Sequence, residues 1–401
     1  MRMRNKELKI KNYKTITSNK QPGTSNLTMI TRHFTFTLIG AFLLLLLASW
    51  GYQGHQKISG GVSIILPHEM AFLVPGWTDI VRLHASDADY RKDTDPDEGP
   101  RHYIDIDNYP EFVLSGRIIQ DMDSLIAVYG LSFLIDQGIL PWATLTSYDS
   151  LVSCFTRHNW EKAGLFAADL GHYVGDGHMP MHLTKNYNGQ FSGNTGIHSR
   201  FETKMINRFA SQIIITDDTV NLIGDVPGFI FSYIYGNYPY VDSILQADDF
   251  AKSVAGNTSS DLYYQTLWET SASFTITLFQ RGSRTLSELI YSAWVEAGKP
   301  LMDPNALPEY QPQQTTRLFQ NFPNPFCSVT NIPVEVIDPD TQVTIQVYDA
   351  TGAIQETILD EKMAAGYYEI PWDSEGKGDG IYYCVLKADD AVMTKKMVVL
   401  H

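Results

Sequence analysis

Histidines and carboxylates recur at helical spacing in the first half of the chain. His172 and Asp176 are four residues apart, and His182 lies six residues further on. The pair His198 and Glu202 repeats the four-residue spacing. Because residues i and i+4 share one face of an α-helix, each pair can present an imidazole and a carboxylate to one point in space. Both ligand types suit Zn²⁺, and a zinc ion with an open position holds a reactive water, so the spacing predicts a catalytic cluster of more than one ion.

Cysteine content bears on the alternative of a structural metal. The chain has three cysteines, Cys154, Cys327 and Cys384, and none is spaced like a zinc ribbon. Structural zinc sites are usually closed four-ligand cages rich in cysteine, so a non-enzymatic exported protein with structural metal is an alternative that the ligand types do not favour. Cys154 is expected to be a buried apolar residue. Whether Cys327 and Cys384 form a disulfide stays open, because it depends on whether they face each other.

Four segments carry apolar residues at three- and four-residue spacing, which predicts amphipathic helices. They are residues 114–136, 150–177, 197–215 and 260–297. Pro180 should end the helix that carries His172 and Asp176, and His182 then falls in the turn beyond it. We therefore expect a multi-helix domain over residues 50–298 to position the metal ligands.

The last part of the chain has a different pattern. A Pro- and Gln-rich stretch at 299–315 predicts a linker. Short alternating runs follow at 332–337, 342–348, 367–372 and 381–386, with turn residues at 349–352 and 376–380. Strands at this spacing favour a small antiparallel sandwich. The predicted fold class is thus mainly α, with a small all-β immunoglobulin-like sandwich over residues 316–401.

The amino-terminal segment indicates export. Residues 1–49 carry a net charge of +7, which leaves a strongly acidic −22 for the remainder. The apolar run at 34–48 is shorter than the about 20 residues of a membrane span, which favours a signal peptide cleaved after Ser49 over an uncleaved anchor. The mature chain would begin at Trp50. Because residues before Met29 are polar and basic, they are interpreted as an extension, and the start stays open between Met1 and Met29.

The carboxy-terminal sandwich carries motifs of a known export signal. They are LFQNFPNPF at 318–326, VYDATG at 347–352, WD at 372–373, GIYY at 380–383 and TKKM at 394–397. Together they resemble the type A sorting domain of type IX secretion in Bacteroidota. The resemblance implies export through the periplasm by the type IX machinery to a secreted or cell-surface location. It also implies that this domain is removed or serves as an anchor, and that it has no catalytic role.

The helical half carries six motifs in one order. They are WGYQGH at 50–55, AD at 88–89, RHYID at 101–105, HYVGD at 172–176, MPMH at 179–182 and HSRFE at 198–202. The set resembles the superfamily of zinc-dependent phospholipases C and fungal zinc nucleases. The resemblance implies a trinuclear zinc site in a helical cleft that hydrolyses phosphodiesters.

The resemblance also implies which residues hold each ion. The first zinc would be held by Asp89, His102, His172 and Asp176. Asp176 would bridge to a second zinc, held also by His55 and by the free amine and carbonyl oxygen of Trp50. The third zinc would be held by His182, His198 and Glu202.

Two aspartates compete for one ligand position. Asp89 is favoured because the family's ligand follows Ala or Pro, as Asp89 follows Ala88, but Asp87 stays possible. Asp89 is also the candidate catalytic residue, since its second carboxylate oxygen could orient the attacking water. Nearby His84 and His178 have no counterpart among the family ligands and are interpreted as supporting residues.

The substrate divides two hypotheses. Glu202 ends its motif as in the bacterial phospholipases C, where the fungal nucleases have Asp. The short spacing from Trp50 to His55 and the position of Arg91 resemble the nuclease branch, and Tyr90 or Tyr103 could stack on a base. Strong acidity argues against a basic groove for nucleic acid. A phospholipid substrate is therefore preferred, with a single-strand-type nuclease as the alternative, and no stable protein partner is predicted.

Overall fold

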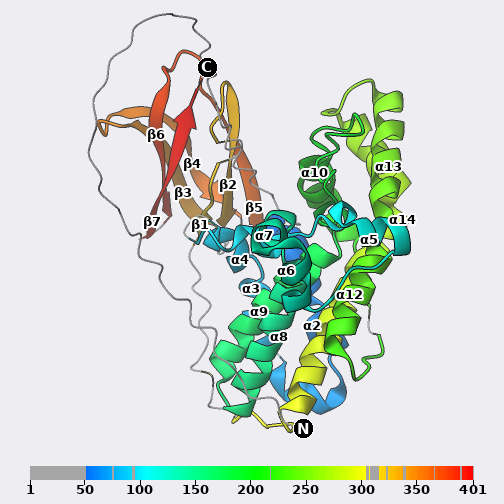
Figure 1. The fold of residues 1–401 in the computed structure, drawn as a ribbon. Helices are drawn as coiled ribbons and strands as arrows, with labels where there is room; N and C mark the ends of the chain where they lie inside the picture. Colours follow the sequence, from blue (N-terminus) through cyan, green and yellow to red (C-terminus); the bar gives the residue numbers. More distant parts are fainter. Residues whose placement is uncertain are drawn as a thin grey trace, which may run out of the picture. The chain divides into compact units, whose positions relative to one another are not determined.

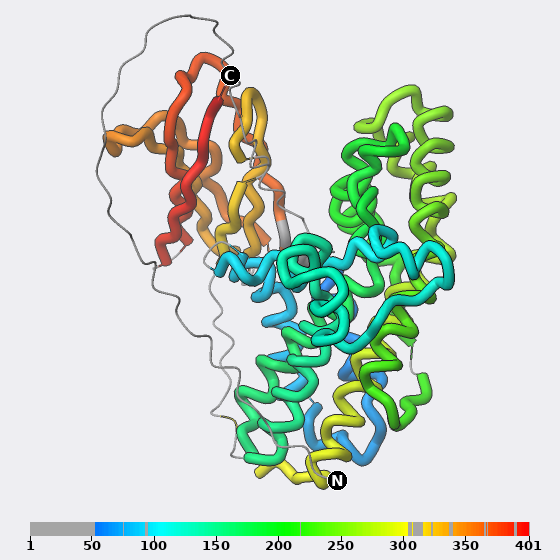
Figure 2. Tube along the Cα trace, in the orientation of Figure 1, coloured from blue at the N-terminus to red at the C-terminus, as the bar shows by residue number. Residues whose placement is uncertain are grey.

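The computed structural model describes residues 51–400 except 75, 93–94, 217, 304–306, 308–315, 322–323, 337–339, 365 and 389–390. The predicted signal peptide, its extension, Trp50 and most of the predicted linker lie outside the described residues. The described part contains a helical domain and a smaller β domain, shown as ribbon and tube in Figures 1 and 2. The predicted fold class, mainly α followed by a small all-β domain, is confirmed.

One buried helix, α9 (Trp160–Gly177), organises the helical domain. It begins where the side chain of Asn159 accepts a hydrogen bond from the Lys162 amide at 3.2 Å, and it ends three residues before Pro180. The helices packed against it are α1 (Gly51–Gly60), α3 (Trp77–Leu83), α8 (Leu140–Thr156) and α14 (Asp261–Glu296). Small residues allow this close packing: a Cβ added at Gly171 would lie 2.7 Å from Ser59 Oγ.

Shorter elements surround this centre. The α-helices are α2 (Val62–Ile65), α4 (Asp87–Arg91), α5 (Pro110–Ser115), α6 (Met122–Tyr129), α7 (Leu131–Gln137), α10 (Ile197–Ser199), α11 (Ile206–Phe209), α12 (Val226–Asn237) and α13 (Tyr240–Ala255). The 3₁₀ turns are η1 (His68–Leu73), η2 (Gly99–His102), η3 (Ile106–Asn108), η4 (Pro180–His182) and η6 (Ala210–Gln212), and η5 (Arg200–Met205) is a π-helix.

The predicted helices are confirmed in part. Residues 260–297 form the single long helix α14, seen in yellow and green in Figure 1. The segment 114–136 is not one helix, because Gly116 and Gly130 adopt φ values of 73° and 85° and divide it. The segment 150–177 breaks between α8 and α9, and 197–215 changes from α to π geometry at Arg200. Helices α1 to α4, α12 and α13 were not predicted.

Three apolar clusters hold the helical domain together. One is built around Trp77, one around Phe201 and one around Tyr109, and all three side chains are fully buried. Helix α9 contributes Val174 to the first cluster and Tyr173 to the third. The polar side chains of α9 near its carboxyl end are therefore enclosed between packed apolar layers.

The β domain consists of two antiparallel sheets. One has the order β1 (Arg317–Leu318), β2 (Val329–Val336), β5 (Gly366–Asp373), and the other β4 (Ile354–Met363), β3 (Thr341–Asp349), β6 (Gly380–Ala388), β7 (Ala391–Val399). Ile345 in β3 faces Leu386 in β6, and both join Trp372 of the other sheet in one core. The four predicted strands are confirmed, whereas β1, β4 and β7 were missed. Most of β4 is solvent-exposed, so it lacks the apolar alternation that marks a half-buried strand.

The three cysteines differ in their exposure to solvent. Cys154 is buried within α8, as predicted. Cys327 is exposed and Cys384 is buried in β6, and the structure leaves both as free thiols. Across the described ranges, no helix combines the length and apolar character that crossing a membrane requires.

Candidate metal centre

Eight of the nine predicted ligands converge in the helical domain, and the ninth, Trp50, lies outside the described residues. They form three groups whose ligand atoms lie within 4.8 Å of one another: His55, Asp89 and His172; His102, His172 and Asp176; and His182, His198 and Glu202. Because His172 belongs to two groups, the first two form one continuous cluster. Of these eight side chains only Asp89 is substantially exposed, at 22%.

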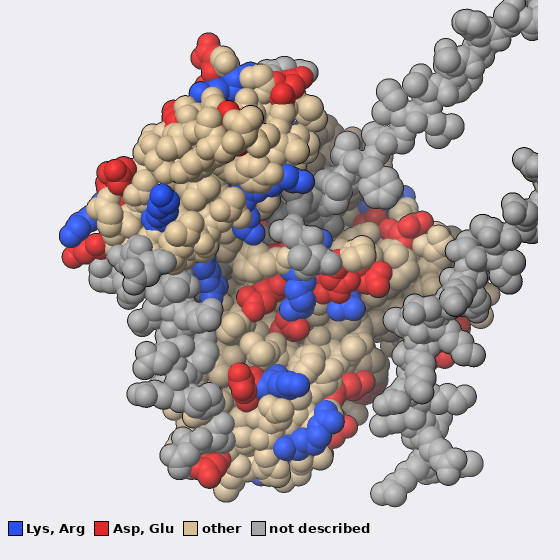
Figure 3. All heavy atoms as spheres, turned by 90° about the vertical axis from the view of Figure 1, so that its left-hand side faces the viewer, with Lys and Arg blue, Asp and Glu red and all other residues tan. Residues whose placement is uncertain are grey.

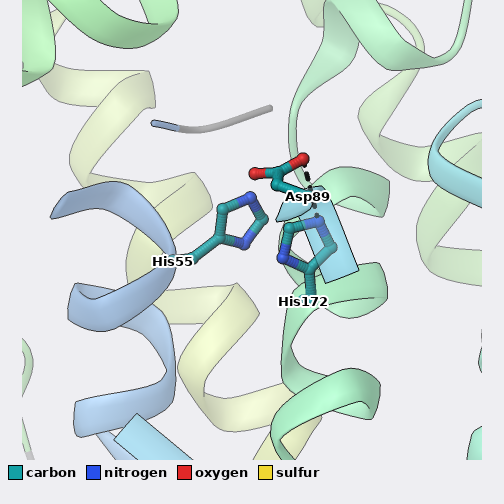
Figure 4. A group of neighbouring side chains, drawn as sticks. All are labelled: His55, Asp89 and His172. Carbon is teal, nitrogen blue, oxygen red and sulfur yellow. Dashed lines mark ion pairs between the residues drawn. The ribbon is translucent and has the colours of Figure 1, made fainter. Parts of the chain in front are cut away.

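Figure 4 shows the first group, in which side chains from three elements point toward one another. His55 comes from α1, Asp89 from α4 and His172 from α9. The imidazole rings of His55 and His172 stack with their centroids 3.8 Å apart, and Asp89 Oδ1 lies 3.6 Å from His172 Nε2. No two of these residues are neighbours in sequence, so only the packing of α1 and α4 on α9 creates the group.

Gly175 provides the space for His55. A Cβ built at this position would lie 2.8 Å from His55 Nδ1 and 3.0 Å from its Cε1. Any side chain there would displace the imidazole. The role of Gly175 was missed in the sequence, although its place inside the HYVGD motif was a signal that could have found it.

Backbone carbonyls fix the orientation of three histidines. His172 Nδ1 lies 2.7 Å from the carbonyl oxygen of Ala85, His182 Nδ1 lies 2.6 Å from that of His102, and His198 Nδ1 lies 3.0 Å from that of Tyr187. A carbonyl oxygen only accepts, so each Nδ1 must carry the proton and donate it. The lone pair of each neutral ring is then on Nε2. This arrangement is typical of metal-ligating histidines.

His102 has the opposite orientation. Its Nδ1 lies 3.0 Å from both Asp176 Oδ2 and His172 Nε2, and its Nε2 lies 3.4 Å from Glu98 Oε1. The fully buried Glu98 also accepts a hydrogen bond from Tyr173 Oη at 2.5 Å. A carboxylate behind a histidine favours the proton on the far nitrogen, which leaves Nδ1 facing the cluster. Glu98 was missed in the sequence. Its four-residue spacing to His102 was the signal that could have found it.

Asp176 lies at the centre of the site. Its Oδ2 is 3.4 Å from His172 Nε2, and its Oδ1 is 3.7 Å from His55 Nε2 and 3.4 Å from His182 Nδ1. Burial alone would raise the pKa of Asp176, but the imidazoles around it hold that pKa well below the usual range. The ionised carboxylate thus faces separate histidines with its two oxygens, as a bridging ligand does.

The structure brings Asp89, not Asp87, to this cluster. Asp87 Oδ2 is 2.6 Å from His84 Nδ1, whereas Asp89 Oδ1 is 2.7 Å from Lys92 Nζ and 3.7 Å from His102 Nδ1. Burial opposes ionisation of Asp89, but the charges of Lys92 and of the neighbouring imidazole of His172 hold its pKa well below the usual range. Lys92 was also missed in the sequence.

Arg91, whose position close to Asp89 resembles the nuclease branch, forms its ion pairs outside the cluster. Its Nη1 is 2.9 Å from Asp169 Oδ1 and its Nε is 3.2 Å from Glu98 Oε2. It therefore supports the carboxylate behind His102. His178 is also outside the cluster: it donates from Nδ1 to the Val174 carbonyl at 2.8 Å, and its ring stacks on that of Tyr233.

The third group shows most directly that a cation fits. Glu202 Oε2 lies 2.5 Å from His198 Nε2, and Oε1 lies 3.6 Å from His182 Nε2. Neither carboxylate oxygen, nor His182 Nε2, makes a hydrogen bond to a described residue, although all three atoms are buried. Burying polar atoms without a hydrogen bond costs free energy. A metal ion among these three side chains would satisfy them all, and nitrogen with carboxylate oxygen is a donor set that suits zinc.

The charges of the centre also favour bound cations. Burial alone would lower the pKa of His182, but Asp176 and Glu202 outweigh it and raise that pKa to about 9. Burial and the nearby His172 lower the pKa of His55. The enclosed carboxylates thus attract positive charge strongly, and bound metal ions would supply it.

The comparisons with known proteins concern the two domains separately. Residues 320–400 match the family model described as the secretion system C-terminal sorting domain. The resemblance inferred for the β domain is thereby confirmed, and it indicates secretion or cell-surface attachment.

Two solved structures resemble the chain at a distance. The alpha-toxin from Clostridium absonum has 11% sequence identity and a TM-score of 0.38, covering 88% of this chain and 98% of the toxin. An alpha-toxin of Clostridium perfringens from the avian strain SWCP has 12% identity and a TM-score of 0.37, covering 88% and 99%. No curated protein sequence matches the chain. At such distance a structural likeness carries no functional argument, and function has to be argued from the site.

Proposed function

We propose that the helical domain is a zinc-dependent phosphoric diester hydrolase of the phospholipase C type. The observation that carries this proposal is the convergence of three buried histidine and carboxylate groups in which Asp176 faces several imidazoles at once. Three histidines are held by backbone carbonyls with Nε2 as the lone-pair nitrogen. A shared carboxylate and the absence of cysteine from the three groups argue against a structural metal cage.

The residues present would hold three zinc ions. As the resemblance implies, Asp89, His102, His172 and Asp176 would hold the first ion, and His182, His198 and Glu202 the third. Asp176 and His55 would hold the second ion together with the amine and carbonyl of Trp50, which are proposed from the sequence. When bound, zinc would lower the pKa of a water to near neutrality and offset negative charge on the phosphoryl oxygens. Because Nδ1 of His172, His182 and His198 donates to a backbone carbonyl, Nε2 is the nitrogen of each ring that would bind an ion.

Asp89 is the proposed catalytic residue. As the most exposed of the eight described ligands, it lies where the cluster meets solvent and can accept a hydrogen bond from a water. Lys92 Nζ, 2.7 Å from Asp89 Oδ1, places an ammonium at the same edge of the site. It offsets the carboxylate charge there and would attract a phosphate oxygen of the substrate.

A phospholipid is the preferred substrate. The position of Arg91 in the sequence resembles the nuclease branch. In the structure, however, Arg91 forms ion pairs with Asp169 and Glu98, so it gives the nuclease alternative no further support. On the face seen in Figure 3, Lys and Arg are interspersed with Asp and Glu. The Glu that ends the third-site motif, Glu202, is the family feature that favours phospholipase C.

The test is an assay of the chain from Trp50 onward on phosphatidylcholine vesicles and on single-stranded DNA. Activity on the vesicles that is lost with a chelator and restored by zinc is expected. Asp89→Asn should reduce this activity at least about a hundredfold, whereas Asp87→Asn, whose carboxylate pairs with His84, should retain it. Cleavage of DNA alone would support the nuclease alternative, and activity unaffected by chelation would refute the zinc proposal.

A further inference from the structure

Arg200 lies between two proposed ligands, His198 and Glu202, yet its side chain makes its contacts elsewhere. It is 9% exposed and its guanidinium makes four hydrogen bonds. Nε donates to Tyr263 Oη at 2.8 Å, and Nη1 to the Thr195 carbonyl at 2.8 Å. Nη2 donates to the Asn194 carbonyl at 3.2 Å and to Asp248 Oδ1 at 2.9 Å.

These contacts join four separate parts of the helical domain. Asp248 belongs to α13 and Tyr263 to α14, whereas Asn194 and Thr195 belong to the loop before α10. The guanidinium therefore ties the start of η5 both to the preceding loop and to the two long helices behind it. Only a planar group with five donors in fixed directions can serve these acceptors together, and a lysine cannot replace it.

Asp248 is the charged centre of this network. It is fully buried and accepts hydrogen bonds from Tyr263 Oη and, at 2.8 Å, from Asn194 Nδ2. Lys252 Nζ lies 3.0 Å from Asp248 Oδ2, the oxygen that Asn194 also binds. A buried carboxylate left without its guanidinium is strongly destabilising, so the network favours one arrangement of these elements.

The backbone around the ligands explains why such an anchor is needed. Glu202 lies within the π-helix η5, and π geometry is uncommon and frequent at functional sites. His198 is held from the other side, because its Nδ1 donates to the carbonyl of Tyr187 in the loop that Arg200 also binds. Arg200 thus contacts the supports on both sides of the third group without belonging to that group.

We infer that the Arg200–Asp248 pair positions His198 and Glu202, and thereby sets the affinity of the third metal site while leaving the other two unchanged. This inference rests on the proposed function, because it presupposes that the three groups bind zinc. Arg200 is a positioning residue and contacts neither the proposed ions nor the reacting atoms. The cluster around Asp176 is held by α1, α4, η2 and α9, which the network does not include.

The test compares Arg200→Lys and Asp248→Asn with two reference variants in the chain from Trp50 onward. Glu202→Ala removes a proposed ligand and shows what loss of the third ion looks like. Arg208→Lys is the matched control. Arg208 lies on the same helical segment as Arg200, but it pairs with the exposed Asp261 and not with Asp248. Tyr263→Phe removes the hydroxyl that accepts from Arg200 and donates to Asp248, but it leaves the Arg200–Asp248 ion pair in place. It is the mildest change, should the Arg200 and Asp248 variants fail to fold.

The measurements are zinc content after dialysis, zinc affinity by chelator competition, and melting temperature without metal. Arg200→Lys and Asp248→Asn are expected to bind two ions instead of three, with an affinity for the third reduced about tenfold to a hundredfold, as for other residues that orient ligands. Tyr263→Phe should show a smaller loss of the same ion, and Arg208→Lys should match the unaltered chain.

The outcomes separate the two proposals. An unaltered chain that binds no zinc refutes the proposed function. An unaltered chain with three ions, together with folded Arg200→Lys and Asp248→Asn that also keep three ions at unchanged affinity, overturns the inference alone. Parallel loss of all three ions also overturns it, because the network would then support the whole domain instead of one site.

Discussion

His182 donates a hydrogen bond from Nδ1 to the backbone carbonyl of His102 across 2.6 Å. The amide of Ile104 returns a hydrogen bond to the carbonyl of His182 at 2.8 Å. These two bonds link the segment that carries His182, a ligand of the third group, to the segment that carries His102, a ligand of the central cluster. Since the bonds involve main chain, the spacing between the two groups is set by backbone geometry.

Asp176→Asn tests the shared carboxylate. The substitution keeps the size of the side chain but removes the charge that faces His55, His102 and His172. We expect loss of the two ions of the central cluster and of nearly all phosphodiesterase activity, measured by metal analysis and by turnover. The exposed Asp242→Asn on α13 is the control. Three ions still bound to Asp176→Asn would show that this carboxylate does not bridge.

Gly175→Ala tests the space that His55 occupies. The added methyl would approach His55 Nδ1 to 2.8 Å, so the imidazole must shift away from the cluster. We expect one ion fewer and a large loss of activity, because misplaced ligands lose affinity. Gly236→Ala in α12 is the matched control, since its added Cβ meets nothing within 4 Å and alanine favours a helix. Equal zinc content in both variants would mean that His55 is not a ligand.

The amino terminus of the mature chain provides a third test, which concerns Trp50 and lies outside the described residues. A peptide nitrogen has no available lone pair because of amide resonance, whereas a free amine can donate one to zinc. A chain beginning at Trp50 should bind one more zinc ion than the same chain with an amino-terminal tag, and should be much more active. Identical zinc content and activity would refute cleavage after Ser49 as the event that completes the site.

Asp105 gives a pH-dependent prediction. Burial and the neighbouring Asp107 raise the pKa of Asp105 from its usual 3.8 to about 7, although Lys185 acts in the opposite direction. Between these two values the native carboxyl binds a proton that the unfolded chain releases. The contribution of Asp105 to the free energy of unfolding therefore falls as pH rises from about 4 to 7 and stays constant above pH 7. The fall amounts to about 1.4 kcal/mol for each unit by which folding raises the pKa.

Asp105→Asn should remove this dependence. The variant is expected to melt several degrees higher than the unaltered chain at pH 8 and at nearly the same temperature at pH 4, with the exposed Asp136→Asn as a control. Comparing each variant with the unaltered chain at the same pH cancels the titration of the other groups. A difference in melting temperature that is the same at both pH values would contradict the raised pKa.

Local patterns in the sequence were enough for several features. The four-residue spacings of His172 with Asp176 and of His198 with Glu202 placed each pair on one face of a helix, and Pro180 indicated where α9 ends. Alternating apolar residues predicted four strands of the β domain, and its motifs identified the sorting domain. These features depend on neighbours a few residues apart, which a single sequence displays.

Contacts between segments far apart in the chain determined the features that residue spacing could not predict. The carbonyls that orient His172 and His182 lie 87 and 80 residues away in the chain, and they set which nitrogen of each ring carries the lone pair. Asp89 was separated from Asp87 only by the packing of α4 on α9, which turned one carboxylate to the cluster and the other to His84.

The supports of the site were likewise missed in the sequence. Arg200 meets Asp248 from 48 residues away, and Gly175 meets His55 from another helix. Glycine and arginine have many roles in proteins, so their type alone indicates none of them. Their functions follow from which surfaces meet in three dimensions, and that is determined by the packing of the whole helical domain.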